Sequence, residues 1–368
     1  EGSNIAIGSD ASLRVKGINN ISIGQSSGAQ ITTGDANTLI GQFAGSRISS
    51  GCHNVFIGHE AGCDATTGLA NVAIGFDAGR GIVGGNSNTF LGDCAGTNLI
   101  SGDFNVFLGK NAGLANTNGS CNVFIGVEAG CNTTGGQENV FLGTRAGFAN
   151  TGGVQNTFLG FDAGKCNSAG SHNLYAGCGA GCAATTASCN TVIGCDAGRG
   201  LTTGCFNVFL GSGAGLGAST GQSNVYLGVS AGRCGCMASN NVMVGTCAGF
   251  ANTSGTSNSF FGIDAGKCNS TGSHNIYMGC GSGCSGTTAS CNTALGCDAG
   301  RGLTTGSHNV FLGNGTGTGT NITGDCNVVI GRGAQSTAVT TSNEVTIKGG
   351  TTNARFSQGE TAWTFTSD

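Results

Sequence analysis

The chain has 368 residues, of which 73 are Gly, none is Pro and 9% are charged, and its formal net charge is −4. A mildly acidic chain without a basic run is not expected to bind nucleic acid or an anionic membrane surface, and no apolar stretch approaches the 18 or more residues of a membrane helix. Disorder is also excluded, because the 38% of residues that are hydrophobic recur at regular positions.

A five-residue phrase recurs along the chain, from NIAIG at Asn4 through NVFLG at Asn105. Its Asn is repeated every 17 residues from Asn20 to Asn309, and a final step of 18 leads to Asn327. We number each repeat from this Asn as position 1. Gly stands at position 5 of every repeat, Ala-Gly usually at positions 8 and 9, and a further Gly commonly at position 15, often after Thr-Thr. Such a short fixed period indicates a solenoid.

Each phrase is predicted to be a β-strand. Seventeen residues with two or three Gly corners are too few for a helical repeat and fit one coil of a parallel β-solenoid. The β-branched residues of the phrase favour a strand, whereas a helix would carry Gly in every second turn at about 1 kcal/mol each. The predicted fold class is therefore all-β, a parallel β-solenoid or β-roll with 17-residue coils, and its shaft spans residues 1–334.

Three successive apolar residues in each strand are unusual for a coil with a single interior. Neighbouring residues of a strand face opposite ways, so Val106 and Leu108 are assigned to the coil interior and Phe107 to the outside. An aromatic stripe of this length is rarely left exposed. We therefore expect it to pack against copies of itself. The candidate oligomer interface is the ladder Phe56, Phe90, Phe107, Phe124, Phe141, Phe158, Tyr175, Phe209, Tyr226, Phe260, Tyr277 and Phe311. The alternative is a monomeric solenoid that covers this ladder with its own Ala-Gly segment.

A six-coil block is repeated within the shaft, from Phe161 and again from Ile263, and it carries many of the 20 Cys. On the 17-residue period, some Cys stack directly and others are diagonal neighbours, within reach of a disulfide. The candidate disulfides, which would join adjacent coils, are Cys178–Cys195, Cys280–Cys297, Cys166–Cys182, Cys268–Cys284 and Cys189–Cys205. The alternative is that these Cys are free and act as small buried hydrophobic residues.

The remaining polar positions are assigned mainly to structure. The Asn at position 1 is expected to form a stacked side-chain ladder and to tolerate the left-handed conformation of a corner. Acids recur at position 7, for example Asp77 and Asp264, where solvated corners are favoured over a calcium ladder because the nonapeptide calcium signature is absent. No Ser/His/Asp constellation, phosphate loop or zinc spacing occurs. No catalytic, metal or cofactor site is therefore predicted.

The repeats resemble two known families. NIAIG at Asn4 and NVAIG at Asn71 resemble the SVAIG-type repeats in the head domains of trimeric autotransporter adhesins, which are left-handed parallel β-rolls in a three-chain bundle. The longer form, NTFLGxxAG…TTG with a spacing of 17, resembles the repeat arrays of phage tail fibres and related bacterial surface proteins. Such arrays commonly precede an endosialidase-type intramolecular chaperone. The resemblance covers residues 4 to about 334, and it implies that the oligomer is a homotrimer.

Residues 335–368 are predicted to be a β neck, in which the 17-residue period is lost from Ser342 and the only Trp is Trp363. In the resembling fibre proteins such a neck leads into a chaperone that opens with a sequence like S-D-E-R-L-K and cuts itself off at a Ser-Asp bond. The ending at Ser367 and Asp368 resembles that junction, so a removed chaperone is expected to follow. Strict cleavage would place Asp368 with the chaperone, which departs from the family's pattern.

The sequence thus predicts a non-enzymatic shaft protein of a phage tail fibre, located in the virion and outside the cell. Its partners would be copies of itself and a host-surface glycan or protein receptor, bound through the polar loops between Ala-Gly and the next Asn. The alternatives are a bacterial adhesin or self-assembling surface filament, and less favourably an ice-binding solenoid or a polysaccharide-cleaving tailspike. The Thr-Thr-Gly corners suggest ice binding, but the Thr pair is interrupted at Thr117-Asn118 and elsewhere.

Overall fold

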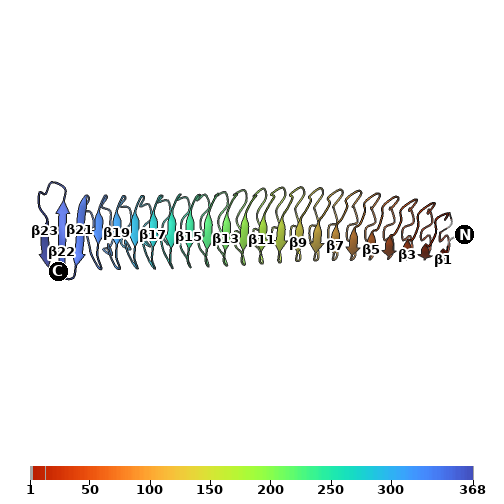
Figure 1. Ribbon diagram of the computed structural model, residues 1–368, viewed down its shortest axis with the longest axis horizontal. Helices are drawn as coiled ribbons and strands as arrows, with labels where there is room; N and C mark the ends of the chain where they lie inside the picture. Colours follow the sequence, from red (N-terminus) through yellow and green to blue (C-terminus); the bar gives the residue numbers. More distant parts are fainter. Residues whose placement is uncertain (1–2, 13, 368) are drawn as a thin grey trace. The chain divides into compact units, whose positions relative to one another are not determined.

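The computed structural model describes residues 3–12 and 14–367, in two compact units, Glu1–Ser188 and Cys189–Asp368 (Figure 1). The first unit contains β1 (Ile5–Ile7), β2 (Ile21–Ile23), β3 (Thr38–Ile40), β4 (Val55–Ile57), β5 (Val72–Ile74), β6 (Thr89–Leu91), β7 (Val106–Leu108), β8 (Val123–Ile125), β9 (Val140–Leu142), β10 (Thr157–Leu159) and β11 (Leu174–Ala176). The second contains β12 (Thr191–Ile193), β13 (Val208–Leu210), β14 (Val225–Leu227), β15 (Val242–Val244), β16 (Ser259–Phe261), β17 (Ile276–Met278), β18 (Thr293–Leu295), β19 (Val310–Leu312), β20 (Val328–Ile330), β21 (Glu344–Gly349), β22 (Thr352–Ser357) and β23 (Thr364–Ser367).

Within each unit the strands of successive coils pair in parallel and in register. Phe107 of β7 lies opposite Phe124 of β8, and their neighbours pair in the same way. Figure 1 shows the strands of each unit following one another side by side, each joined to the next by one returning loop. The predicted parallel β-solenoid with coils of about 17 residues is therefore confirmed.

From β2 to β20 the middle residue of each three-residue strand is buried in the interior of its own coil, whereas all three residues of β1 are exposed. Phe107 is fully buried, whereas its neighbours Val106 and Leu108 are partly exposed. From Phe107 to Tyr175 the rings of successive coils stack with centroids 4.7–5.0 Å apart and interplanar angles of 5–6°. Gly at position 9 makes room for each ring, since a Cβ on Gly113 would lie 2.5 Å from Cε2 of Phe107. Each coil therefore fills its own core.

Position 12 faces the same interior as position 3, and the sizes of the two side chains are complementary. A Cβ built on Gly45 would lie 2.8 Å from Leu39 at position 3 and 2.7 Å from Ile48 at position 12, so both side chains reach one space. Where position 3 is Tyr277, position 12 is Gly286, whose built Cβ lies 3.5 Å from the Tyr hydroxyl. In several coils a large side chain at one of these positions is thus accompanied by a small one at the other, although Phe90 and Leu99 are both large and both buried.

The coil of Ala73 and Ile82 offers a test of this complementarity. Ala73→Phe alone should overpack the layer and cost about 1–3 kcal/mol, and Ile82→Ala alone should cost about 2–5 kcal/mol. In the double variant the new ring would enter the column between Phe56 and Phe90, which flank Ala73 in the paired strands, and would fill the space left by Ile82. A double-mutant cycle from denaturation of the full chain measures the coupling. Additive costs would contradict a shared layer.

The Asn at position 1 forms the predicted side-chain ladder. The backbone N and Nδ2 of Asn122 donate to Oδ1 of Asn105, at 3.0 and 3.1 Å. Nδ2 also donates to the carbonyl of Gly136 in its own coil, at 2.9 Å. The ladder is confirmed, but the left-handed conformation expected at this Asn is found at the residue before it, such as Cys121 with φ 59°. Extended backbone at position 1 is what allows the Asn side chain to point inward.

The C-terminal segment continues the coil register further than predicted. Val328 of β20 lies opposite Val345 of β21 in parallel, 17 residues later, so the expected loss of the period from residue 342 is wrong by one coil. Glu344 takes the place of the Asn, and its N donates to Oδ1 of Asn327 at 3.0 Å. The buried Glu344 carboxylate accepts from Thr337 N at 3.0 Å. β22 and β23 then add in antiparallel orientation.

Candidate functional site

The predicted aromatic ladder lies inside the solenoid and does not face outward. Its members are 0–1% exposed within the single chain, so they have no surface left for a partner. The assignment of this ladder to an interface between chains is therefore wrong, and so is the assignment of Val106 and Leu108 to the coil interior. The corrected residues are Phe56, Phe90, Phe107, Phe124, Phe141, Phe158 and Tyr175 in the first unit and Phe209, Tyr226, Phe260, Tyr277 and Phe311 in the second.

The side chains at positions 2 and 4 of the strands form what we call the outer strand face. Most of them are apolar in both units, from Val and Ile in β4 to Val and Leu in β19, but position 2 is Thr or Ser in β3, β6, β10, β12, β16 and β18. Several are substantially exposed, including Leu142 at 46%, Ile276 at 44% and Met278 at 47%. Position 6, at the next corner, adds Phe76 at 52% and Phe161 at 48%. Large exposed apolar side chains thus recur along this side of each unit, although others, such as Phe104 and Phe206, lie on the returning loops.

The acids at position 7 occupy left-handed corners and are held by ion pairs. Asp162, Asp264 and Asp298 have φ values of 55°, 57° and 54°, a conformation that Asp tolerates better than most residues. Asp264 lies 3.1 Å from Lys267 three residues on, and Asp298 lies 3.5 Å from Arg301. No group of three His, Cys, Asp or Glu able to hold a metal ion occurs among residues 3–12 and 14–367.

The first Thr of the Thr-Thr corners uses its hydroxyl within the fold. Oγ1 of Thr66 donates to the carbonyl of Val83 in the next coil at 2.9 Å, and Thr202 donates to Ser219 at 3.0 Å. Comparable bonds recur along position 13, for example from Thr134 to Thr151 at 2.9 Å. This column therefore braces one coil against the next, in addition to the backbone hydrogen bonds.

The structure places three of the candidate cysteine pairs side by side. The backbone N of Cys268 donates to the carbonyl of Cys284 at 3.0 Å, and Cys166 and Cys182 are joined in the same way. Cys280 and Cys297 stand at position 6 of successive coils, and Cys280 is close enough to raise the pKa of Cys297. Of the other two pairs, Cys178 and Cys195 belong to different units, and Cys189 and Cys205 both lie in the second unit.

These cysteines lack the character of a reactive site. Cys268, Cys280, Cys284 and Cys297 are free thiols in the described structure. Burial raises the pKa of the Cys268 thiol, and the neighbouring Cys284 raises it further. Burial, the carboxylate of Asp298 and Cys280 raise the pKa of Cys297. Because the thiolate is the nucleophile and the metal ligand, these shifts favour protonated, structural thiols, and the five disulfides stay predictions.

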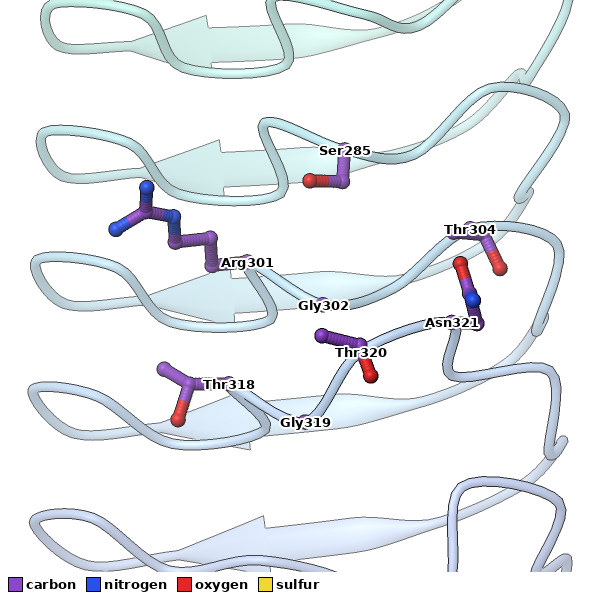
Figure 2. A pocket seen from close by; sticks show the side chains of 8 residues that line it. All are labelled: Ser285, Arg301, Gly302, Thr304, Thr318, Gly319, Thr320 and Asn321. Atoms are coloured by element: carbon purple, nitrogen blue, oxygen red, sulfur yellow. The ribbon is translucent and has the colours of Figure 1, made fainter.

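Two adjoining hollows lie on the loop side of the second unit. The hydroxyl hollow, about 170 Å³, is lined by Ser285, Arg301, Gly302, Thr304, Thr318, Gly319, Thr320 and Asn321. The thiol hollow, about 290 Å³, is lined by Asp264, Lys267, Cys268, Cys280, Gly281, Cys284, Ser285, Asp298 and Arg301. Figure 2 shows the hydroxyl hollow on three successive loops, with the Arg301 side chain extending toward the coil of Ser285 and Asn321 reaching toward Thr304. Arg301 and Ser285 belong to both hollows.

The hydroxyl hollow owes its shape to the single 18-residue coil. Gly302 of the preceding coil packs so closely on Gly319 of this coil that a Cβ would meet the Gly319 carbonyl, and Asn321 of this coil takes φ 59°. Gln335 of the next coil braces this segment, since Gly319 N donates to its Oε1 at 3.1 Å and its Nε2 donates to Thr318 at 2.8 Å. The sequence signalled this irregularity only as one extra residue before Asn327.

The junction predicted at Ser367 and Asp368 lies at the limit of the described residues. The backbone of Ser367 ends β23 opposite Thr352, and Asp368 lies outside the described residues. Among the residues that the structure describes, no helix is both long enough and apolar enough to cross a membrane.

Comparisons of the chain with protein-family models, with curated proteins and with solved structures found no match. The structure itself defines the class of the protein. It is an all-β repeat protein, a parallel β-solenoid built from coils of about 17 residues.

Proposed function

We propose that the chain is a non-enzymatic shaft protein of a phage tail fibre, and that three copies associate through their outer strand faces. The repeated coils support a structural role, because each coil adds the same strand, the same Asn bonds and the same packed core. The tail-fibre assignment rests on the resemblance of the NTFLGxxAG repeats and of the Ser367-Asp368 ending, and so does the number three. The extracellular, virion-associated location belongs to the same proposal.

The observation that carries the proposal is the outer strand face. Position 4 carries an apolar side chain in every coil, and position 2 carries an aliphatic one in most coils; these side chains are partly exposed in most coils and substantially exposed in several. Monomers rarely leave a long apolar stripe in water. A second copy presents the same columns with the same period, so every coil finds an equivalent coil opposite. An unrelated partner would match only by chance. The shared apolar core expected from the sequence is thus retained, with aliphatic columns in place of the aromatic ladder.

Two lysines placed on this face test the proposal. The full chain should sediment as an assembly near three times its 35.9 kDa. Leu142→Lys combined with Met278→Lys should weaken association by at least about 100-fold, because unpaired ammonium groups are costly to bury. The matched control is Asn132→Lys with Thr271→Lys, which adds the same charge at exposed loop positions. Sedimentation of the unaltered chain as a monomer, or a lysine variant with an unchanged mass, would overturn the shared face.

The alternative, a bacterial adhesin or self-assembling surface filament, would use the same face. The coding sequence on either side of this segment distinguishes it from the tail fibre. A chaperone domain after residue 368 supports the tail fibre, and a membrane anchor supports the adhesin. Ice binding is not favoured, because the first hydroxyl of each Thr pair donates to a backbone carbonyl and only the second is left to meet ice.

A further inference from the structure

The proposed tail-fibre role needs a surface that contacts the host, and the two hollows of the second unit are candidates for it. All of the hydroxyl hollow lies in the loop segments that follow Ala-Gly, which the sequence already favours for receptor contact. The loop side elsewhere is regular, with each Thr or Ser bonded to the next coil. The irregularity at the 18-residue coil therefore interrupts this regular pattern where the hydroxyl hollow lies.

The thiol hollow exists because small residues interrupt a column of charged ones. Asp264 and Asp298 stand at position 7 of their coils, and the coil between them has Gly281 there. A Cβ on Gly281 would lie 2.5 Å from Oδ1 of Asp298, so the Asp side chain leans over the glycine. At position 10, Cys284 likewise separates Lys267 from Arg301. The result is a recess bordered by an ion pair on either side.

The charges around the two hollows balance. Lys267 is paired with Asp264 at 3.1 Å, and Arg301 is paired with Asp298 at 3.5 Å, so two positive and two negative groups give a sum of zero. The other polar groups are neutral hydroxyls and the amide of Asn321. An anionic ligand would meet both carboxylates, and a cation would meet both basic groups. A ligand with many neutral donors and acceptors meets partners of both kinds.

We propose that the two hollows together bind a neutral saccharide of the host surface, with Arg301 as the central contact. Arg301 borders both hollows, and its guanidinium donates in a fixed planar fork. Ser285, Thr320 and Asn321 supply hydroxyl and amide groups elsewhere along the hydroxyl hollow, where Asn321 reaches toward Thr304. The site rests on the proposed function for its biological role. Its chemistry depends only on the described side chains.

The test is saturation-transfer NMR on the full chain with glucose, galactose, mannose and lactose, beside glucuronate and galactose 6-sulfate. A neutral sugar should receive saturation. Arg301→Gln and Asn321→Gly should each weaken its binding at least about tenfold, the loss expected for hydrogen bonds to a charged or a closely placed polar group. Gly at position 321 keeps the left-handed backbone while removing the amide. The matched control, Arg47→Gln, alters an equally exposed, ion-paired Arg in the first unit and should change nothing.

The inference is overturned if no neutral sugar binds, if the anionic sugars bind more tightly, or if the two hollow variants bind like the unaltered chain. Sedimentation of the same samples separates this failure from failure of the shaft proposal. An assembly that binds no sugar refutes the saccharide site alone, and a monomer that binds sugar through Arg301 refutes the assembly alone.

Discussion

Replacing Phe124 by alanine is expected to open a cavity in the middle of the aromatic column and to destabilise the surrounding coils by about 3–5 kcal/mol. The Phe124 ring is fully buried, and it stacks on Phe107 at 4.8 Å and on Phe141 at 4.7 Å. Its removal costs the transfer energy of the ring and exposes one face of each neighbour to the void. Gly130 cannot fill the space, because it carries no side chain.

Hydrogen exchange of the full chain measures this effect, because a solenoid opens locally as well as globally. Amide protection should fall most at the coils of Phe107, Phe124 and Phe141. The control is Ile100→Ala, which shortens an apolar side chain that is 51% exposed on the loop side and should cost less than about 0.5 kcal/mol. If the two variants lost the same amide protection, Phe124 would contribute no more to stability than an exposed side chain, which would contradict an interior aromatic column.

The period and its corners were predictable from the sequence, because each has a local physical cause. Gly at position 5 meets the Gly of the next coil so closely that a Cβ on Gly109 would lie 2.6 Å from the Gly126 carbonyl oxygen, and no other residue fits such a column. The inward Asn ladder follows from stacking identical side chains at one coil spacing. Both features depend on the repeat alone, so one sequence is enough to find them.

Which face of each strand is buried was not predictable from the alternation of side chains. Alternation places Phe107 opposite Val106 and Leu108, but it does not say which side is the interior. The choice depends on the returning loop, where Gly113 leaves space for a ring. The sequence did contain one signal: small residues at position 12 accompany large ones at position 3, as with Gly286 and Tyr277. Such a correlation arises only between side chains that share a space.

The hollows around Arg301 were also beyond the sequence. The extra residue before Asn327 marks an irregular coil, but its consequence depends on how Gly302 and Gly319 pack. From the sequence, every acid at position 7 is interpreted as a solvated corner residue. Only the neighbouring Gly281 makes Asp298 the border of a recess.

The second large effect is expected from the Asn ladder. Asn122→Ala removes the bond to the Gly136 carbonyl and leaves the backbone N and Nδ2 of Asn139 without the acceptor that they bind at 3.0 and 3.1 Å. Nδ2 of Asn139 keeps its bond to the Gly153 carbonyl, so the Gly136 carbonyl and the Asn139 backbone N are the two buried groups left unsatisfied. At about 1–3 kcal/mol each, the total should reach about 2–6 kcal/mol. Gln137→Ala, at an exposed position of the same coil, is the control and should be nearly neutral.

Asn122→Asp separates the role of the amide donor from that of the acceptor. The new carboxyl keeps an oxygen for Asn139, but when ionised it cannot donate to Gly136, and it faces the Asn105 oxygen that Nδ2 now contacts at 3.1 Å. Burial should raise its pKa in the folded chain above the unfolded value of about 3.9. The folded state then binds the proton more tightly, so the variant should be least destabilised below pH 4 and lose stability as the pH rises through the raised pKa. Denaturation of the variant and the unaltered chain at pH 3.5 and pH 7 measures the difference, and a pH-independent cost would contradict a buried donor at this position.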